Sequence, residues 1–512
     1  MGDSHMQPIS ENDVRRRLQR DNPWWNDKSH SIPEEKYPRR VYFKPFAKLA
    51  LDRSIQRAAV LLGPRRVGKT VMIKQLVSEA VTQGLNPENI LYASIDTPIY
   101  AGFLLEKYLS FFTKFVDNEN YLVIFDEIQY LKDWEVHLKD LVDSYKNIKF
   151  VATGSAAAAL RLKSRESGAG RFSEFMLPPL TFYEFLMFQN LHDELVEEAD
   201  ERVFLARDIE RLNVEFINYL NYGGYPEAVL NAQIRENSDQ FIRNDIVDKV
   251  LLKDLPSLYG INDIQELNRL FSFLAYNAGN EASLEKISKE SGISKPTIKK
   301  YIEYLESAFL IIKVQNVDDT CKTMKRERNF KIYLNNPSMR AALFAPVELD
   351  DNVSIGHLVE SAIFSQWQHS PQARQLRYAR WKNEGEVDIV FLSPLTERPV
   401  WVAEVKWSDR VKAAYGSQMG NISHFIRKNT EVDSGLLTTK TVSGRVKVDD
   451  VIVEIRPSAL HCYVLGKNIT SNMIKKLIQT PDNEEFIDNI VEDEDFGDDM
   501  DDFDHAVDDS QK

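Results

Sequence analysis

The chain has 512 residues, of which 43% are hydrophobic, enough for roughly three or four domains at about 100–200 residues each. No apolar run approaches the roughly 18 residues of a membrane helix, so we expect no membrane partner. The two cysteines, Cys321 and Cys462, cannot form a disulfide framework or a zinc site by themselves. These features predict a soluble, cytoplasmic protein.

The formal net charge of −14 comes from one end of the chain. Residues 481–512 hold 15 Asp and Glu and one Lys, which leaves 63 acidic and 63 basic residues in positions 1–480. We expect 476–512 to be a disordered acidic tail, because this composition cannot bury a core. The tail either competes with nucleic acid for a phosphate-binding groove or only keeps the protein soluble. Because the rest is neutral, a nucleic-acid site has to be a local basic patch.

Short apolar runs alternate with helical patterns near the N-terminus. TVMIKQLVSEAV and GFLLEKYLSFFTKFV, which lie between some of the runs, have helical spacing. The predicted strands are RAAVLLG (57–63), ILYASID (90–96), YLVIFDE (121–127) and KFVATGS (149–155). The alternation predicts an α/β fold with a parallel sheet covered by helices. We assign it to residues 46–180, after an N-terminal segment 1–45, with a helical lid at 181–260.

The stretch GPRRVGKT (63–70) fits the phosphate-loop pattern G-x-x-x-x-G-K-[ST] between a predicted strand and a helix. Two glycines, Gly63 and Gly68, let backbone N–H groups curl around phosphates. Lys69 is expected to reach the β- and γ-phosphates, and Thr70 to hold Mg²⁺. The predicted nucleotide-binding residues are Gly63, Pro64, Arg65, Arg66, Val67, Gly68, Lys69, Thr70, Asp126, Thr153 and Ser155.

The later strands supply candidate catalytic groups. YLVIFDEIQ ends in Asp126 and Glu127, beside the phosphate loop. Asp126 is predicted to hold Mg²⁺ through water, and Glu127 to polarise the attacking water. ATGS offers Thr153 and Ser155 as sensors of the γ-phosphate or the water. Arg171 in SGAGRF is a candidate arginine finger, acting in this chain or on a neighbour, which allows for a homo-oligomer.

These motifs, followed by a helical lid, resemble an AAA+ ATPase. GPRRVGKT, DEIQ, ATGS, GRF…LPPLTFYEF and GGYPEAV together resemble a group of prokaryotic AAA+ proteins, over roughly residues 22–470. The resemblance implies ATP and Mg²⁺ as cofactors and a C-terminal domain with a nuclease-like signature. By association alone, it suggests a role in defence against foreign DNA.

Residues 261–345 predict a winged helix-turn-helix. In SLEKISKESGISKPTIKKYIEYLESAFLIIKV (283–314), Ser294 is the expected N-cap of a second helix. Lys295, Lys299 and Lys300 are candidates to face DNA phosphates. The presumed wing adds Lys322, Lys325, Arg326, Arg328 and Lys331. The module either contacts DNA through backbone charge or only connects two domains.

Residues 346–475 contain two charged positions inside an apolar strand, VWVAEVKW (400–407). Folding GEVDIVFLSPLTERPVWVAEVK as a hairpin about its centre puts Asp388 opposite Glu404, within one residue. Facing carboxylates need a cation, and Mg²⁺ prefers such oxygen ligands. Lys406 lies on the same face, and Glu360, in the amphipathic helix SIGHLVESAIFSQW (354–367), is expected to complete the metal site.

A helix Glu, then Asp, then Glu-x-Lys on a hairpin resembles the PD-(D/E)xK nuclease core. The resemblance implies metal ligation by Glu360, Asp388 and Glu404 and catalysis by Glu404 and Lys406. Lys412 and Gln418 either support the site or face solvent. We expect an ATPase with a metal-dependent nuclease acting on DNA. The alternatives are an ATP-driven binding switch, or a remodeller of protein complexes, with an inert C-terminal domain.

Overall fold

A computed structural model describes residues 10–27, 31–100, 103–112, 116, 119–155, 158, 170–200, 203–321, 329–381, 385–410 and 419–479. For residues 473–479 it describes only the backbone. Residues 480–512 of the predicted acidic tail, the wing residues Lys322, Lys325, Arg326 and Arg328, and Lys412 and Gln418 lie outside these ranges. The first tail residues, 476–479, were expected to be disordered but form the end of a helix over Ser458–Gln479. None of the helices within them is long and apolar enough to cross a membrane.

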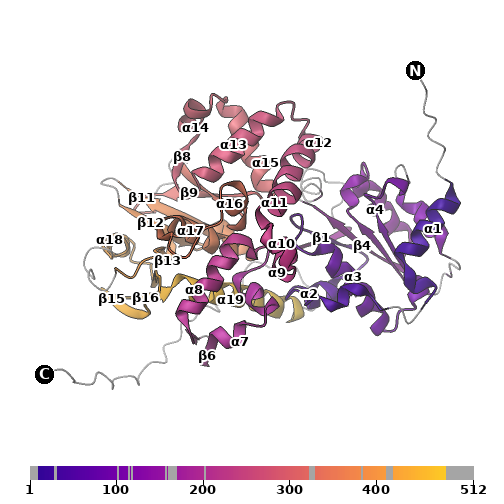
Figure 1. The fold of residues 1–512 in the computed structure, drawn as a ribbon, viewed down its shortest axis with the longest axis horizontal. Coiled ribbons are helices and arrows are strands. Elements are labelled where there is room, and N and C mark those ends of the chain that lie inside the picture. Colours follow the sequence, from indigo (N-terminus) through magenta and orange to yellow (C-terminus); the bar gives the residue numbers. More distant parts are fainter. Residues whose placement is uncertain are drawn as a thin grey trace.

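The N-terminal module is built on a five-stranded parallel sheet in the order β2-β3-β4-β1-β5 (Figure 1). The first four strands are those predicted, since each is a continuous apolar run buried on both faces. The elements are α1 (Glu11–Asp21), α2 (Phe43–Leu51), β1 (Ala58–Leu62), α3 (Lys69–Thr82), β2 (Ile90–Ser94), β3 (Tyr121–Asp126), α4 (Trp134–Ser144), β4 (Ile148–Gly154) and β5 (Phe172–Met176).

Two details of this module differ from the sequence prediction. In the predicted helix GFLLEKYLSFFTKFV, the structure has a 3-10 helix over Leu105–Phe111, whose period of three still turns Leu105, Tyr108 and Phe111 into the core. The edge strand β5 was missed because Phe175 is its one fully buried side chain, so no apolar run marks it.

A helical region follows. Its elements are α6 (Phe182–Phe188), α7 (His192–Leu195), α8 (Ile209–Asn218), α9 (Pro226–Leu230), α10 (Ala232–Glu236), α11 (Ser238–Ile242) and α12 (Leu255–Tyr259). The prediction of helices alone was wrong at VEEADERVFLA, where β6 (Val196–Asp200) pairs antiparallel with β7 (Val203–Ala206). In β7, Phe204 is buried while Val203 and Leu205 on either side of it are exposed, and this alternation fits a strand.

The remaining strands form one nine-stranded mixed sheet, ordered β15-β16-β14-β13-β12-β11-β9-β10-β8. Its elements are α13 (Ile264–Tyr276), β8 (Glu281–Ser283), α14 (Leu284–Ser291), α15 (Lys295–Ser307), β9 (Ile311–Val317), β10 (Asn329–Leu334), α16 (Ser338–Leu343), α17 (Asn352–Trp367), β11 (Leu376–Arg380), β12 (Glu386–Leu392), β13 (Pro399–Glu404), α18 (Gly420–Lys428), β14 (Ser434–Thr439), β15 (Gly444–Val448), β16 (Val451–Pro457) and α19 (Ser458–Gln479). Because β9 pairs with β11, the boundary predicted at 345/346 does not divide this sheet.

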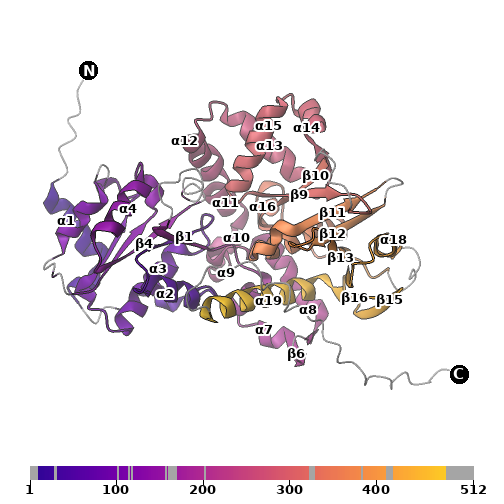
Figure 2. The ribbon, with the colours of Figure 1, turned by 180° about the vertical axis from the view of Figure 1, so that it is seen from behind.

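The last helix connects the C-terminal sheet back to the rest of the chain. From β16, α19 runs across the molecule and packs on α17, α6, α8 and α2 (Figure 2). The C-terminal sheet is therefore held against both the helical region and the N-terminal module.

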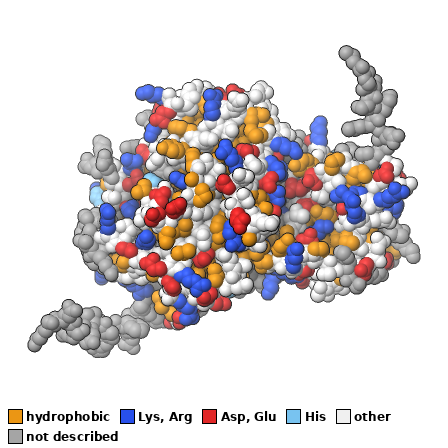
Figure 3. Space-filling model, viewed as in Figure 1, with side chains coloured by type: hydrophobic (Ala, Val, Ile, Leu, Met, Phe, Trp, Pro, Cys, Tyr) orange, Lys and Arg blue, Asp and Glu red, His pale blue; other side chains and the backbone are white. Residues whose placement is uncertain are grey.

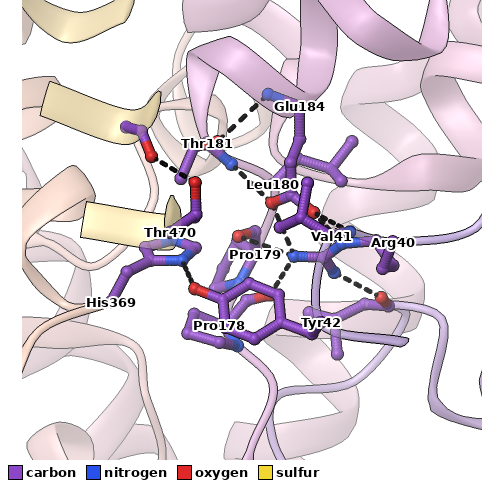
Figure 4. A network of polar contacts seen from close by, with 12 residues as sticks. Arg40, Val41, Tyr42, Pro178, Pro179, Leu180, Thr181, Glu184, His369 and Thr470 are labelled. Atoms are coloured by element: carbon purple, nitrogen blue, oxygen red, sulfur yellow. Dashed lines mark hydrogen bonds and ion pairs between the residues drawn. The ribbon is translucent and has the colours of Figure 1, made fainter. Parts of the chain in front are cut away.

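A buried ion pair lies where these parts meet (Figure 4). Arg40 binds both carboxylate oxygens of Glu184 and donates to the carbonyls of Val67 and Pro178. Glu184 also closes a capping box with Thr181 at the start of α6. Nearby, the Tyr42 hydroxyl is hydrogen-bonded to Nδ1 of His369, which follows α17. Arg40 therefore joins the phosphate loop to the helical region through an ion pair that is almost completely buried.

We expect Arg40→Met to destabilise the protein by about 3–5 kcal/mol, because it leaves the Glu184 charge buried and unpaired. The control is its neighbour Arg39, which is more exposed and pairs with Glu35 and Glu79. Arg39→Met should cost at most about 1 kcal/mol. Urea unfolding of both variants measures the difference, and similar midpoints for the two would contradict a structural role for the Arg40 pair.

Candidate functional site

The phosphate loop runs from the carboxyl end of β1 to the start of α3. Gly63 is required by close packing, since a Cβ there would lie 2.2 Å from the Leu177 carbonyl oxygen. Gly68 has φ +96°, a backbone conformation that side chains disfavour. The loop thus leads directly into the N-terminus of α3, where the first backbone N–H groups of a helix have no partner within the helix and suit phosphate.

Lys69 is buried inside this loop and donates to the carbonyl oxygens of Gly63 at 3.0 Å and Pro64 at 2.7 Å. Burial lowers the pKa of Lys69, and the charges of Glu127 and Asp126 oppose that effect. The amine is therefore close to the loop that would hold the phosphates, in contact only with neutral carbonyls. It can exchange these for phosphate oxygens without breaking an ion pair.

Thr70 and Asp126 meet as predicted, with Thr70 Oγ1 donating to Asp126 Oδ2 at 2.9 Å. Tyr92 donates to the same oxygen at 2.9 Å, and Thr153 binds the other one. Burial, followed by the charge of Glu127, raises the pKa of Asp126. A hydroxyl beside a buried carboxylate fits Mg²⁺, which takes one or two carboxylates together with waters and substrate phosphates.

Glu127 lies at the edge of this site in the left-handed backbone region, with φ 54°. Its backbone N–H donates to Thr153 Oγ1 at 3.0 Å, and its carboxylate accepts from Gln129 Nε2. Gln129 Oε1 in turn accepts from the Ser155 backbone at 3.2 Å. The Ser155 hydroxyl is buried with no hydrogen-bond partner, so it is free to form a hydrogen bond with a bound ligand.

The two arginines of the phosphate loop bind the helical region. Arg65 makes a two-pronged ion pair with Asp254, at 2.8 and 2.7 Å. Arg66 binds Glu227 at 2.8 Å and Asp245 at 2.9 Å. Their side chains thus link the loop to the lid, while their backbone remains part of the loop.

Arg171 is not beside this chain's own phosphate loop. Its carbonyl accepts from the Ala58 backbone where β1 begins, and its side chain pairs with Asp143. Since β1 and β5 run parallel, the phosphate loop is at the other end of the strand, roughly 15 Å away. A finger role within one chain is therefore wrong for this geometry, and a role toward a neighbouring chain stays a prediction.

A second cluster of charged side chains lies on the nine-stranded sheet. Ile389 pairs with Ala403, so the next position in this antiparallel register sets Asp388 against Glu404, as predicted. Both carboxylates are buried. Lys406 Nζ lies 2.8 Å from Glu404 Oε1 and 3.4 Å from Asp388 Oδ2.

Glu360 joins the cluster from α17, accepting from the Tyr333 hydroxyl at 2.7 Å. Burial, followed by the charge of Asp388, raises the pKa of both Glu360 and Glu404. Glu404 Oε2 is buried without a hydrogen-bond partner. Such an oxygen is costly unless a cation or donor meets it.

Lys331 is the main correction to the sequence analysis. The basic stretch predicts Lys331 in a DNA-binding wing, but in the structure it is 3% exposed and pairs with the carboxylate cluster. Its Nζ lies 2.5 Å from Glu386 Oε1, 3.5 Å from Glu360 Oε2 and 3.7 Å from Asp388 Oδ1. Side chains alternate along β10, so Lys331 and Tyr333 point to the same face of the sheet. This alternation could have predicted the position of Lys331, had residues 329–334 been recognised as a strand of this sheet.

Within the described ranges, no three His, Cys, Asp or Glu side chains are grouped to hold a metal ion. The predicted three-carboxylate site is therefore not formed, because Lys331 lies between Glu360 and Asp388. Asp388 and Glu404 remain together, and two carboxylates suffice for Mg²⁺ when water and phosphate supply the other ligands.

The helix-turn-helix lysines lie apart from this cluster. Ser294 caps α15 by accepting from Thr297, as predicted. Lys299 and Lys300 are exposed, and Lys295 is paired with Glu285 at 2.9 Å. On the face shown in Figure 3, basic and acidic side chains are interspersed.

Comparison with known families assigns the N-terminal module. Residues 56–186 match the family described as "AAA domain". Their parallel sheet, with the phosphate loop between β1 and α3, has the fold of a P-loop module of the AAA+ class. Residues 213–351 match a "Domain of unknown function (DUF8612)", a match that crosses the boundary predicted at 260/261.

Three relatives are described as uncharacterized proteins. One from Haemophilus influenzae is 30% identical over 273 residues, 51% of this chain and 62% of the relative. MJ1544 of Methanocaldococcus jannaschii is 27% identical over 53% of this chain and 60% of its own length. MJ1637 of the same organism is 24% identical over 72% and 82%. The chain thus spans less than two thirds of the first two relatives.

Solved structures show more distant likenesses. The Aeropyrum pernix ORC1 protein in complex with DNA has 12% identity and a TM-score of 0.31, covering 62% of this chain and 95% of that one. AMPPCP-bound DnaA from Aquifex aeolicus has 16% identity and a TM-score of 0.28, covering 55% and 92%. Likenesses at this level add nothing to the assignment of the AAA domain.

We expect Lys69→Ala to weaken nucleotide binding, because it removes the point charge on the phosphates. Glu127→Gln should bind nucleotide normally but hydrolyse it about 10²–10⁴-fold more slowly. Nucleotide titration and steady-state ATP hydrolysis measure the two effects. Normal turnover by Glu127→Gln would show that Glu127 is not the base.

If Arg171 acts on a neighbouring chain, ATP hydrolysis per chain should rise with protein concentration. Arg171→Ala should then lose hydrolysis and keep nucleotide binding. Arg57 is an exposed arginine at the same edge of the sheet, so Arg57→Ala is the control. Constant activity per chain on dilution to a verified monomer would count against this role.

Proposed function

We propose that the chain is an ATP-hydrolysing AAA+ protein whose C-terminal sheet carries a metal-dependent nuclease acting on DNA. The observation that supports the nuclease is the meeting of two buried carboxylates, Asp388 and Glu404, with the partly exposed Lys406, in which one oxygen of Glu404 lacks a hydrogen-bond partner. The order of elements around it, α17, three antiparallel strands, α18 and a parallel strand, agrees with the PD-(D/E)xK resemblance.

In the ATPase reaction, the phosphate loop and Lys69 would bind and orient the β- and γ-phosphates. Thr70 and Asp126 would hold Mg²⁺, which neutralises charge on the transferring phosphoryl group. Glu127 would accept the proton of the attacking water, with its carboxylate positioned by Gln129. Ser155 would contact the γ-phosphate or that water.

In the nuclease reaction, Asp388 and Glu404 would hold the divalent ion, which activates water and stabilises charge on the scissile phosphate. Lys406 is 39% exposed, so it can turn from Glu404 toward water or phosphate. The Val405 backbone N–H donates to Asp388 Oδ2 at 2.8 Å and fixes that carboxylate.

The net charge of the cluster favours the binding of a divalent ion. The cluster contains five carboxylates, which pair with three cationic side chains, Lys331, Arg380 and Lys406. When all groups are ionised, two negative charges remain, which one divalent ion would balance. The carboxylates are Glu281, Glu360, Glu386, Asp388 and Glu404.

The second candidate is an ATP-driven switch or remodeller with an inert C-terminal sheet. It is favoured by the lid contacts of Arg65 and Arg66, which let the phosphate loop control the helical region. It is also favoured by the two lysines, which partly neutralise the carboxylate cluster without any metal.

Incubation with plasmid DNA, Mg²⁺ or Mn²⁺, with and without ATP, separates these functions. We expect cleavage by the unaltered chain and its loss in Glu404→Ala and Lys406→Ala. Glu397→Gln is the matched control, because this carboxylate is exposed in the turn of the same hairpin. Cleavage is also a prerequisite for the suggested role in defence against foreign DNA.

Plasmid that stays intact with both metals, while ATP is hydrolysed, would refute the nuclease and favour the switch. Cleavage that persists equally in Glu404→Ala would point to a contaminating enzyme.

A further inference from the structure

The two lysines of the carboxylate cluster differ in their freedom to move. Lys406 follows the end of β13 and its side chain is 39% exposed. The side chain of Lys331 is 3% exposed and comes from the interior of β10. An incoming metal ion can displace the first into solvent, whereas the second has no route out without opening the sheet.

Lys331 is held by pairing on both sides of its strand. In the ladder it lies opposite Val314 of β9 and Glu281 of β8. Three carboxylates, those of Glu386, Glu360 and Asp388, lie within ion-pair distance of its ammonium group and stabilise that charge. The Tyr378 ring, 5.3 Å from Nζ, faces the same charge.

Asp388 divides the cluster into two flanks. Its Oδ1 faces Lys331 at 3.7 Å, on the flank that contains Glu360 and Glu386. Its Oδ2 faces Lys406 at 3.4 Å, on the flank that contains Glu404 and its unpartnered oxygen. A divalent ion would meet carboxylates on either flank, but on the first it would also meet a fixed ammonium group.

We propose that Lys331 permanently fills the Glu360 flank, so that the cluster binds one divalent ion, between Asp388 and Glu404, instead of two. This rests on the proposed nuclease function. Lys331 is then a positioning residue: it neutralises Glu360 and Asp388 where a second ion would otherwise bind. Repulsion between like charges at close range in a poorly hydrated site keeps the second ion out.

The test counts metal ions. Full-length chain carrying Asp126→Asn, which disables the ATPase metal site, is titrated with Mn²⁺ without nucleotide by calorimetry and by electron paramagnetic resonance. We expect one bound ion per chain. Adding Lys331→Met should raise the number to two, because the freed carboxylates gain an ion in place of the ammonium group. Lys331→Arg keeps the charge and should leave the number at one.

Two ions in the parent protein, or one ion in both the parent and Lys331→Met, would overturn the proposal. No ion in the parent but one in Lys331→Met would retain Lys331 as the group that fills its flank and would refute the nuclease metal site. No ion in either protein would refute both.

A second comparison serves if Lys331→Met fails to fold, which circular dichroism would show. Glu404→Gln should weaken Mn²⁺ binding by at least about tenfold. Glu360→Gln, on the Lys331 flank, should leave the affinity almost unchanged. Equal weakening by the two substitutions would place the ion across both flanks and overturn the proposal.

Discussion

The buried pair between Arg40 and Glu184 is the constraint on which the arrangement of the chain depends. One guanidinium group satisfies a carboxylate at the start of α6 and a carbonyl of the phosphate loop, so neither part can shift without exposing a buried charge. The contact of Tyr42 with His369 lies next to it and reaches the end of α17. Since α17 carries Glu360, the contacts of Arg40 and Tyr42 connect the phosphate loop to the carboxylate cluster on the nine-stranded sheet.

The second constraint is the continuous sheet. A winged helix and a nuclease-like domain would be two bodies with a linker, but β9 pairs with β11 and the two share one hydrogen-bonded ladder. The strand β10, which begins within the predicted wing, delivers Lys331 to the carboxylates. DNA contacts on α15 and chemistry at Glu404 would therefore have a fixed relative geometry, without a flexible joint between them.

Much of the fold followed from local pattern. Continuous apolar runs predicted β1 to β4, and the phosphate loop placed Lys69, Thr70 and Asp126 together because parallel strands end at the same edge. The turn-centred symmetry of the hairpin gave the register of Asp388 and Glu404. These predictions succeeded because each rests on residues that are close in sequence or on a rule of sheet geometry.

The failures involve contacts between distant segments. Lys331 lies in a basic stretch that predicts a solvent-exposed wing, and only the pairing of β9 with β11 turns it toward Asp388. Arg171 looked isolated in sequence, yet the parallel register of β5 puts it at the edge away from the phosphate loop. Gln129 ends the DEIQ motif but had no predicted role, because only the structure shows its amide between Glu127 and Ser155.

The return of α19 onto α2 and α6 affects the order in which the protein can mature. During synthesis, residues 43–51 and 182–188 leave the ribosome long before the helix that covers them. Until residues 458–479 have emerged, the apolar surface under that helix stays open to water or to chaperones. A chain that stops before this helix would therefore lose stability in the N-terminal module as well as in the C-terminal sheet. Premature termination near the end of the chain would thus destabilise a module formed by its first residues.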